Sequence, residues 1–163
     1  MTRIFKMKLQ ITKNNGKPHV ILYKRDDGTE TWMQADDFFV HHDLSHFALE
    51  KTLGYKMAFM GMLSNGMEIN DFENREKRKQ IAITEEAVYA ENMANFFLME
   101  TAQGNFENFN KILQDSFKRM NTSLSAPFLS EKEILSIREY LKQLIAEWKE
   151  LPAGERIYLD YES

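Results

Sequence analysis

The chain has 163 residues, of which 43% are apolar and 28% charged, so it is long enough to bury one core and is not expected to be disordered. It contains no cysteine, which excludes disulfides, thiolate metal sites and cysteine nucleophiles. The net charge of −4 does not favour nucleic acid as a partner, and no apolar run predicts a membrane span. We expect a cytoplasmic protein with one domain over residues 1–163, whose partner is a small molecule or another protein. The sequence does not predict an oligomeric state.

Alternating apolar and polar residues, the period of β-strands, occur near both ends of the chain. The predicted strands are residues 4–12, 20–24, 29–34 and 156–161. Asn15-Gly16 and Asp27-Gly28 separate the first three, and such pairs are typical of hairpin turns. The pattern predicts a three-stranded antiparallel meander, to which the last segment returns as a fourth strand.

Between these strands the apolar spacing changes to that of helices. The predicted helices are residues 41–53, 55–64, 84–103, 106–120 and a last one that starts after Ser130 and stops before Pro152. Thr84 is a suitable N-cap, and Ser130 with Glu133 forms a capping box. Residues 70–80 are polar and are expected to be a linker or a short solvated helix. The fold class predicted is therefore α+β, with an antiparallel sheet of three to four strands packed against about five helices.

The segment from Val40 to Glu50 holds three of the four histidines and two carboxylates. If it is helical, His42 and His46 are i and i+4 neighbours on one face, and Glu50 lies one turn further along. On a helical wheel Leu49 falls within about 20° of His42, so the imidazole pair shares a sector with core residues. Burying a polar group without a partner costs about 1–3 kcal/mol, so these imidazoles need hydrogen bonds or a metal ion.

The predicted helix at 84–103 also has a carboxylate among the residues expected to face the core. On its wheel Glu91 falls inside the apolar sector that includes Val88 and Leu98. Charged residues are rarely buried unless they are paired. Glu91 is therefore the candidate that would meet the histidine pair across a helix interface, as in metal sites built from facing helices.

These features support a divalent metal site, and with it a metal-dependent hydrolase as one hypothesis. His42 and His46 would be ligands, Glu91 or Glu50 would be the third ligand, and Asp43 would act as general base or would orient a ligand. Imidazole and carboxylate ligands suit zinc, iron, manganese or nickel.

The alternative hypothesis is a non-catalytic interaction or binding protein. In that case the histidine pair is hydrogen-bonded and braces the helix against the sheet, while Asp43 and Glu50 fix the ring tautomers. His41 falls on the other side of the helix and takes no part in either hypothesis.

The motif His42-Asp43-Leu44-Ser45-His46 resembles the zincin motif H-E-x-x-H, with aspartate in place of glutamate. That resemblance implies zinc held by His42 and His46, with Asp43 activating a bound water. The doublet His42-Asp43 also resembles the metal-binding pair of the HD-type phosphohydrolases.

A broader resemblance spans most of the chain. The order of a β-meander, a His-Asp-Leu-x-His helix and a closing strand is similar to a family of uncharacterised bacterial proteins. The motifs that carry it are Asp27-Gly28, Trp32, the segment 42–46 and Leu151-Pro152-Ala153-Gly154. The resemblance implies a bacterial origin and this order of elements, and it brings no activity with it.

Overall fold

A computed structural model describes residues 4, 6–72, 76 and 83–162 and confirms the α+β fold class. Its sheet has four antiparallel strands in the order β3-β2-β1-β4. The strands are β1 (Lys6–Thr12), β2 (His19–Arg25), β3 (Glu30–Ala35) and β4 (Arg156–Glu162). The C-terminal strand therefore returns to the N-terminal meander, as the alternation predicted.

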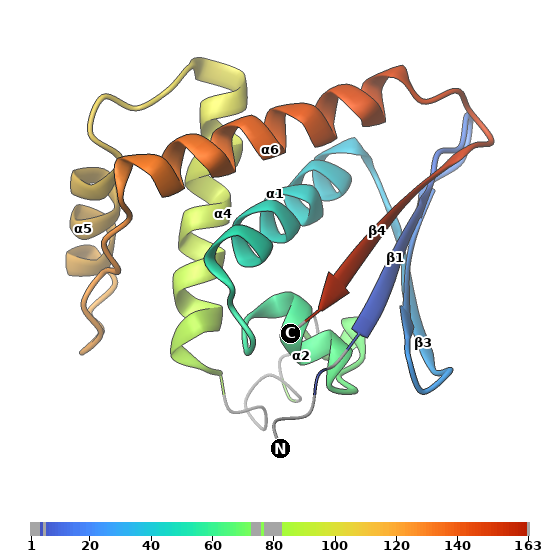
Figure 1. Ribbon diagram of the computed structural model, residues 1–163, viewed down its shortest axis with the longest axis horizontal. Coiled ribbons are helices and arrows are strands. Elements are labelled where there is room, and N and C mark those ends of the chain that lie inside the picture. The colour runs from blue at the N-terminus through green and yellow to red at the C-terminus, as the bar shows by residue number, and fades with distance from the viewer. Residues whose placement is uncertain (1–3, 5, 73–75, 77–82, 163) are drawn as a thin grey trace.

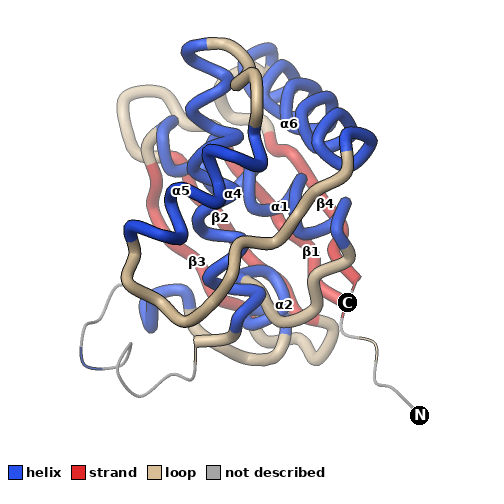
Figure 2. Tube along the Cα trace, turned by 90° about the vertical axis from the view of Figure 1, so that its left-hand side faces the viewer, coloured by secondary structure: helices blue, strands red, loops and turns tan. Residues whose placement is uncertain are grey.

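The two faces of the sheet differ in polarity. Leu9 of β1 is fully buried and pairs with Tyr23 of β2 on one side and with Leu159 of β4 on the other. On the opposite face the large side chains of Trp32 and Tyr158 are exposed. The described helices accordingly cover one face of the sheet, and Figure 2 shows them in front of the strands.

The helices are α1 (Asp37–Leu53), α2 (Phe59–Ser64), the short 3₁₀ helix η1 (Ile69–Phe72), α4 (Glu85–Gln103), α5 (Phe109–Arg119) and α6 (Glu131–Glu150). Helix α1 lies in the middle of the molecule, with the sheet on one side, α4 on the other and α6 alongside it (Figure 1). This position leaves little of α1 exposed, so its polar residues must find partners inside the protein. In the described part of the chain, no helix has both the length and the apolar character needed to cross a bilayer.

Helix α1 begins four residues earlier than the periodicity predicted. Asp36 is its N-cap, and its side chain accepts a hydrogen bond of 3.0 Å from the backbone N–H of Phe39. The two acidic residues before the apolar run were therefore a cap and a first turn. The helix ends as predicted at Gly54, whose φ of 69° is the left-handed conformation that glycine adopts easily.

The second helix is shorter than the predicted range of 55–64. The backbone N–H groups of Lys56 and Met57 donate to the Glu86 carboxylate at 3.0 and 2.8 Å, so a partner from α4 takes the place of a helical turn. These bonds tie the segment between α1 and α2 to the first turn of α4.

The remaining helices agree with the sequence pattern at their caps. The Thr84 side chain caps α4, and the Ser130–Glu133 capping box starts α6. Helix α5 is shorter than predicted because Asn108 provides its N-cap. Of the polar segment 70–80, the first residues belong to η1, and most of the others lie outside the described residues.

Candidate metal centre

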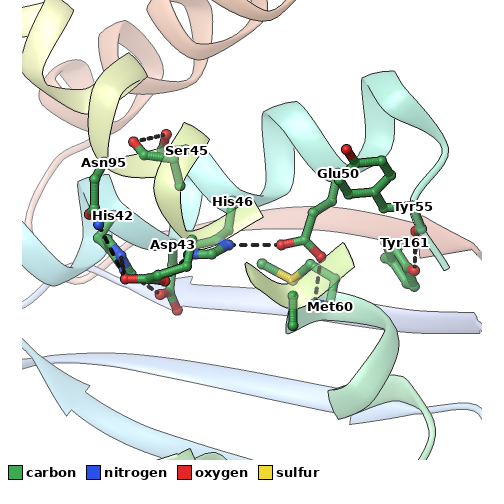
Figure 3. A network of polar contacts seen from close by, with 12 residues as sticks. His42, Asp43, Ser45, His46, Glu50, Tyr55, Met60, Asn95 and Tyr161 are labelled. Carbon is green, nitrogen blue, oxygen red and sulfur yellow. Dashed lines mark hydrogen bonds and ion pairs between the residues drawn. The ribbon is translucent and has the colours of Figure 1, made fainter. Parts of the chain in front are cut away.

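The candidate site lies where α1 packs against α4. The Ser45 hydroxyl donates a 2.8 Å hydrogen bond to the backbone carbonyl of Ala94, which holds the two helices close together. The next residue on α1, His46, meets Glu91, which lies about one turn before Ala94 on α4. His46 itself is buried, and only 2% of its surface is exposed. Figure 3 shows this polar network between α1, α4 and the strands beneath it.

Both ring nitrogens of His46 face carboxylates. Nδ1 lies 2.8 Å from Oε2 of Glu50, and Nε2 lies 2.9 Å from Oε2 of Glu91. An ionised carboxylate only accepts hydrogen bonds, so the ring satisfies both partners when both nitrogens carry a proton. When both carboxylates are ionised, His46 of the metal-free protein is therefore an imidazolium between them.

The pKa values follow from this arrangement. Burial disfavours the charged ring, but the hydrogen bonds with Glu50 and Glu91 outweigh it and raise the pKa of His46 to about 10. The adjacent imidazoles of His42 and His46 hold the pKa of Glu91 well below its usual range. Burial raises the pKa of Glu50, and the hydrogen bond with His46 opposes that rise.

Glu50 is fully buried, and each of its carboxylate oxygens has a hydrogen-bond partner. Oε2 is bound to His46, and Oε1 accepts a 2.8 Å hydrogen bond from the backbone N–H of Met60 in α2 (Figure 3). The carboxylate therefore joins two helices and fixes the orientation of the ring. It contacts the nitrogen that faces away from Glu91, which is the arrangement of a carboxylate that orients a metal-binding histidine.

His42 lies beside His46 with the ring centroids 4.7 Å apart. Its Nε2 is 3.5 Å from Oε1 of Glu91, and its Nδ1 is 3.7 Å from Oδ1 of Asp43. Both contacts are longer than ordinary hydrogen bonds, so the ring is held less tightly than that of His46. Asp43 is itself buried and accepts a hydrogen bond from the Tyr23 hydroxyl of β2. That bond anchors the carboxylate next to His42.

The donor atoms of His42, His46 and Glu91 all lie within 4.8 Å of one another. Ligand atoms bound at about 2.1 Å to one ion are about 3.4 Å apart in a tetrahedron and at most about 4.2 Å apart. A small movement of the side chains, with loss of the His46 proton, would bring these three groups to that spacing. The set of two imidazoles and one carboxylate fits zinc and the other divalent transition metals.

The wheel for α4 placed Glu91 in the wrong sector, although Glu91 does meet the histidines. The buried face of the helix is formed by Ala90, Met93, Ala94, Phe97 and Glu100. Glu91 lies at the edge of this face, and 54% of its side chain is exposed. It is an interface residue between the histidine pair and solvent, held also by Asn95, whose side-chain nitrogen lies 3.3 Å from Oε1.

The other two histidines lie elsewhere. His41 lines a separate hollow with Arg138 and Lys149, as expected for the opposite side of α1. His19 begins β2, and its Nε2 lies 3.0 Å from the Asp37 carboxylate. Neither residue belongs to the three-residue group.

Tyr23 was not predicted as a partner of Asp43, because an aromatic residue in a strand is expected to belong to the core. The pocket above the site was not predicted either. It has a volume of about 450 Å³, and its lining residues include His42, His46 and Glu91. Its walls come from α1, α2, η1, α4 and β3, which only the tertiary structure brings together.

No known protein-family model, curated protein or solved structure matches the chain. The geometry of the site therefore has to carry the functional argument. The resemblance to a bacterial family stays a prediction.

Proposed function

We propose that this protein binds a divalent metal ion through His42, His46 and Glu91. The observation that carries the proposal is the convergence of these three side chains, from two helices, within 4.8 Å. Two further contacts support it. Glu50 holds Nδ1 of His46, which leaves Nε2 for the ion, and Asp43 stands beside Nδ1 of His42.

Three protein ligands would leave a coordination position open toward the pocket, which is the arrangement of catalytic rather than structural zinc sites. For this reason a metal-dependent hydrolase is the enzyme class that we propose. Asp43 is committed to Tyr23 through one oxygen and faces His42 with the other, which favours an orienting role over that of a general base.

The alternative, a non-catalytic protein with a structural histidine pair, is favoured by one observation. Both nitrogens of His46 have carboxylate partners within the protein itself. In this alternative the charged network would brace α1 against α2 and α4, and no metal would be needed to satisfy it.

Elemental analysis by mass spectrometry separates the two. Wild-type protein purified without chelator is expected to carry near-stoichiometric divalent metal. Glu91→Gln and His42→Ala should lose it, because each removes a ligand. The matched control is His41→Ala, which alters a neighbouring histidine of α1 outside the group and should keep the metal. Wild-type protein that stays metal-free after incubation with zinc, iron, manganese and nickel salts would contradict the proposal.

A further inference from the structure

The pocket beside the candidate metal centre has the size of a small-molecule site. Its volume of about 450 Å³ falls within the range of roughly 300–1,000 Å³ that such sites occupy. It opens beside the two imidazoles of α1 and beside Glu91 of α4. A molecule that fills the pocket would therefore reach the proposed metal.

Most of the pocket wall is apolar. The contributing side chains include Met33, Phe39, Phe59, Met62, Phe72 and Val88. Phe59 packs against Phe72 with ring centroids 4.9 Å apart, and against the ring of His46 at 5.2 Å. The aromatic wall therefore continues directly into the polar end of the pocket. A ligand that fills this space has an apolar body.

The polar lining is concentrated in one place. His42, His46 and Glu91 form one group, and Asp43 adjoins it. The remaining polar residue, Asn92, is already engaged, because its side-chain nitrogen donates to the carbonyl of Val88 and its oxygen accepts from Ser116. A complementary ligand therefore has a single polar group at one end.

The charges around that end argue against a charged head group. Three carboxylates, Asp43, Glu50 and Glu91, surround the histidines. The charge of a divalent ion at this end would already be offset by these three carboxylates, and among the described residues that line the pocket there is no lysine or arginine that would neutralise an anionic head. A cationic head would in turn be repelled by a divalent ion at the same place.

We propose that the pocket binds an apolar molecule that ends in one uncharged oxygen-bearing group, such as an alcohol or a carbonyl. The apolar body lies between α2, η1 and α4, and the oxygen takes the open position on the metal. The choice of head group rests on the proposed metal site, whereas the apolar body does not.

The test uses displacement of the uncharged fluorescent probe N-phenyl-1-naphthylamine by three molecules with one chain and different heads. These are 1-decanol, decanoate and decylamine. With metal-loaded wild-type protein, 1-decanol is expected to compete at least about tenfold better than the other two. Equal or better competition by decanoate or decylamine would overturn the choice of an uncharged head. Failure of all three to displace the probe would overturn the pocket as a ligand site.

Filling the pocket provides a second measurement. Ala87 of α4 lines it, and Ala87→Trp should lower the affinity for the probe by at least about tenfold. The matched control is Ala102→Trp at an exposed position of the same helix, which should leave that affinity unchanged. Equal affinities in the two variants would mean that the probe binds elsewhere, and would overturn the inference.

Glu91→Gln distinguishes failure of the metal proposal from failure of the ligand proposal, because it removes a metal ligand and leaves the apolar wall in place. If both proposals hold, this variant keeps probe binding but loses the preference for 1-decanol. Wild-type protein that takes up no metal from added salts but still prefers 1-decanol would overturn the metal and leave the ligand class standing. Metal-loaded protein without that preference would overturn the ligand class and leave the metal standing.

Discussion

The imidazole of His46 is held between two carboxylates that do different things. Glu91 is half exposed and can turn toward an incoming ion, whereas Glu50 is fixed by the Met60 N–H and by complete burial. Nδ1 of the ring therefore has a fixed partner, whereas the partner of Nε2 can be exchanged for a metal ion. This asymmetry is what suits His46 to metal binding.

Glu50→Gln should weaken metal binding without removing a ligand. The amide has one acceptor oxygen, so it cannot serve both His46 and the Met60 N–H as the carboxylate does. We expect the metal affinity to fall by roughly 10–100-fold, as for other groups that orient a metal-binding histidine. Isothermal titration with zinc measures the change. An unchanged affinity would show that Glu50 has no part in positioning the ring.

The charge on His46 also makes the stability of the metal-free protein depend on pH. The pKa of the ring is raised from 6.5 to about 10 in the folded state. Its contribution is therefore complete below the unfolded-state value and is lost as the pH rises toward 10. One proton gives a slope of up to about 1.4 kcal/mol per pH unit.

Denaturant titrations of chelator-treated protein between pH 6 and 10, followed by circular dichroism, measure this slope. His46→Gln should lack this pH-dependent component of the stability, and His41→Gln should retain it. Identical profiles for wild type and His46→Gln would contradict the ionised pair.

Sequence periodicity located both histidines and the carboxylate that meets them, because i and i+4 positions share a helix face whatever the tertiary structure. It could not assign Glu91 to the edge of α4. The apolar sector of a helix in contact with several neighbours is broad, and the buried carboxylate on that helix is in fact Glu100. Which of two carboxylates approaches a histidine depends on how two helices cross, and a single sequence does not encode that in a readable pattern.

At the scale of the elements, α4 and α6 are joined by an ion pair that the sequence did not reveal. Arg138 of α6 contacts both oxygens of Glu100, at 2.9 and 2.6 Å, and also the carbonyl of Phe106. Glu100 in turn accepts from the N–H of Phe106. The pair fixes the turn that follows α4 against α6.

Arg138→Met should destabilise the protein by about 3 kcal/mol, because it leaves the buried Glu100 carboxylate without its cation. Adding Glu100→Gln to this variant should recover part of the loss, since the charge is then removed. Urea unfolding of the single and double variants measures both values. A double variant less stable than Arg138→Met alone would contradict this account.

Element boundaries departed from the periodicity where a partner far along the chain replaced a helical hydrogen bond. The N–H groups of Lys56 and Met57 found Glu86, so α2 starts late. Local signals were sufficient where the cap was local, as at Thr84 and Ser130. The strands and the α+β class were predictable because their alternation and turn residues are local as well.

For the whole molecule, one sheet includes strands from both ends of the sequence. Strand β1 pairs with β2 along one edge and with β4 along the other. Lys13, just after β1, donates from its backbone N–H to the carbonyl of Glu155 at 3.0 Å. The side chain of Lys13 also donates a hydrogen bond, from Nζ to the backbone carbonyl of Trp148 in α6 at 2.7 Å.

We therefore expect the single domain predicted over residues 1–163 to unfold in one cooperative transition. Scanning calorimetry should give equal calorimetric and van't Hoff enthalpies. Removing residues 152–163 should abolish the transition, since it exposes one edge of β1 and the core beneath Tyr161. Two separated transitions in the intact chain would contradict the one-domain prediction.

Because β1 pairs with β4, the sheet cannot be completed until the end of the chain has been synthesised. At about 5–20 residues per second, the strand that completes the sheet is made on the order of ten seconds after β1. Until then one edge of β1 has unpaired backbone groups, the kind of edge at which other chains add. Lys6 and Lys8 alternate along this strand, and their charge discourages such pairing. Once β4 has paired, the Nζ atoms of Lys6 and Lys8 lie 3.6 and 3.8 Å from carboxylate oxygens of Glu162 and Asp160. The lysines that discourage pairing at the open edge of β1 therefore form cross-strand ion pairs in the folded protein.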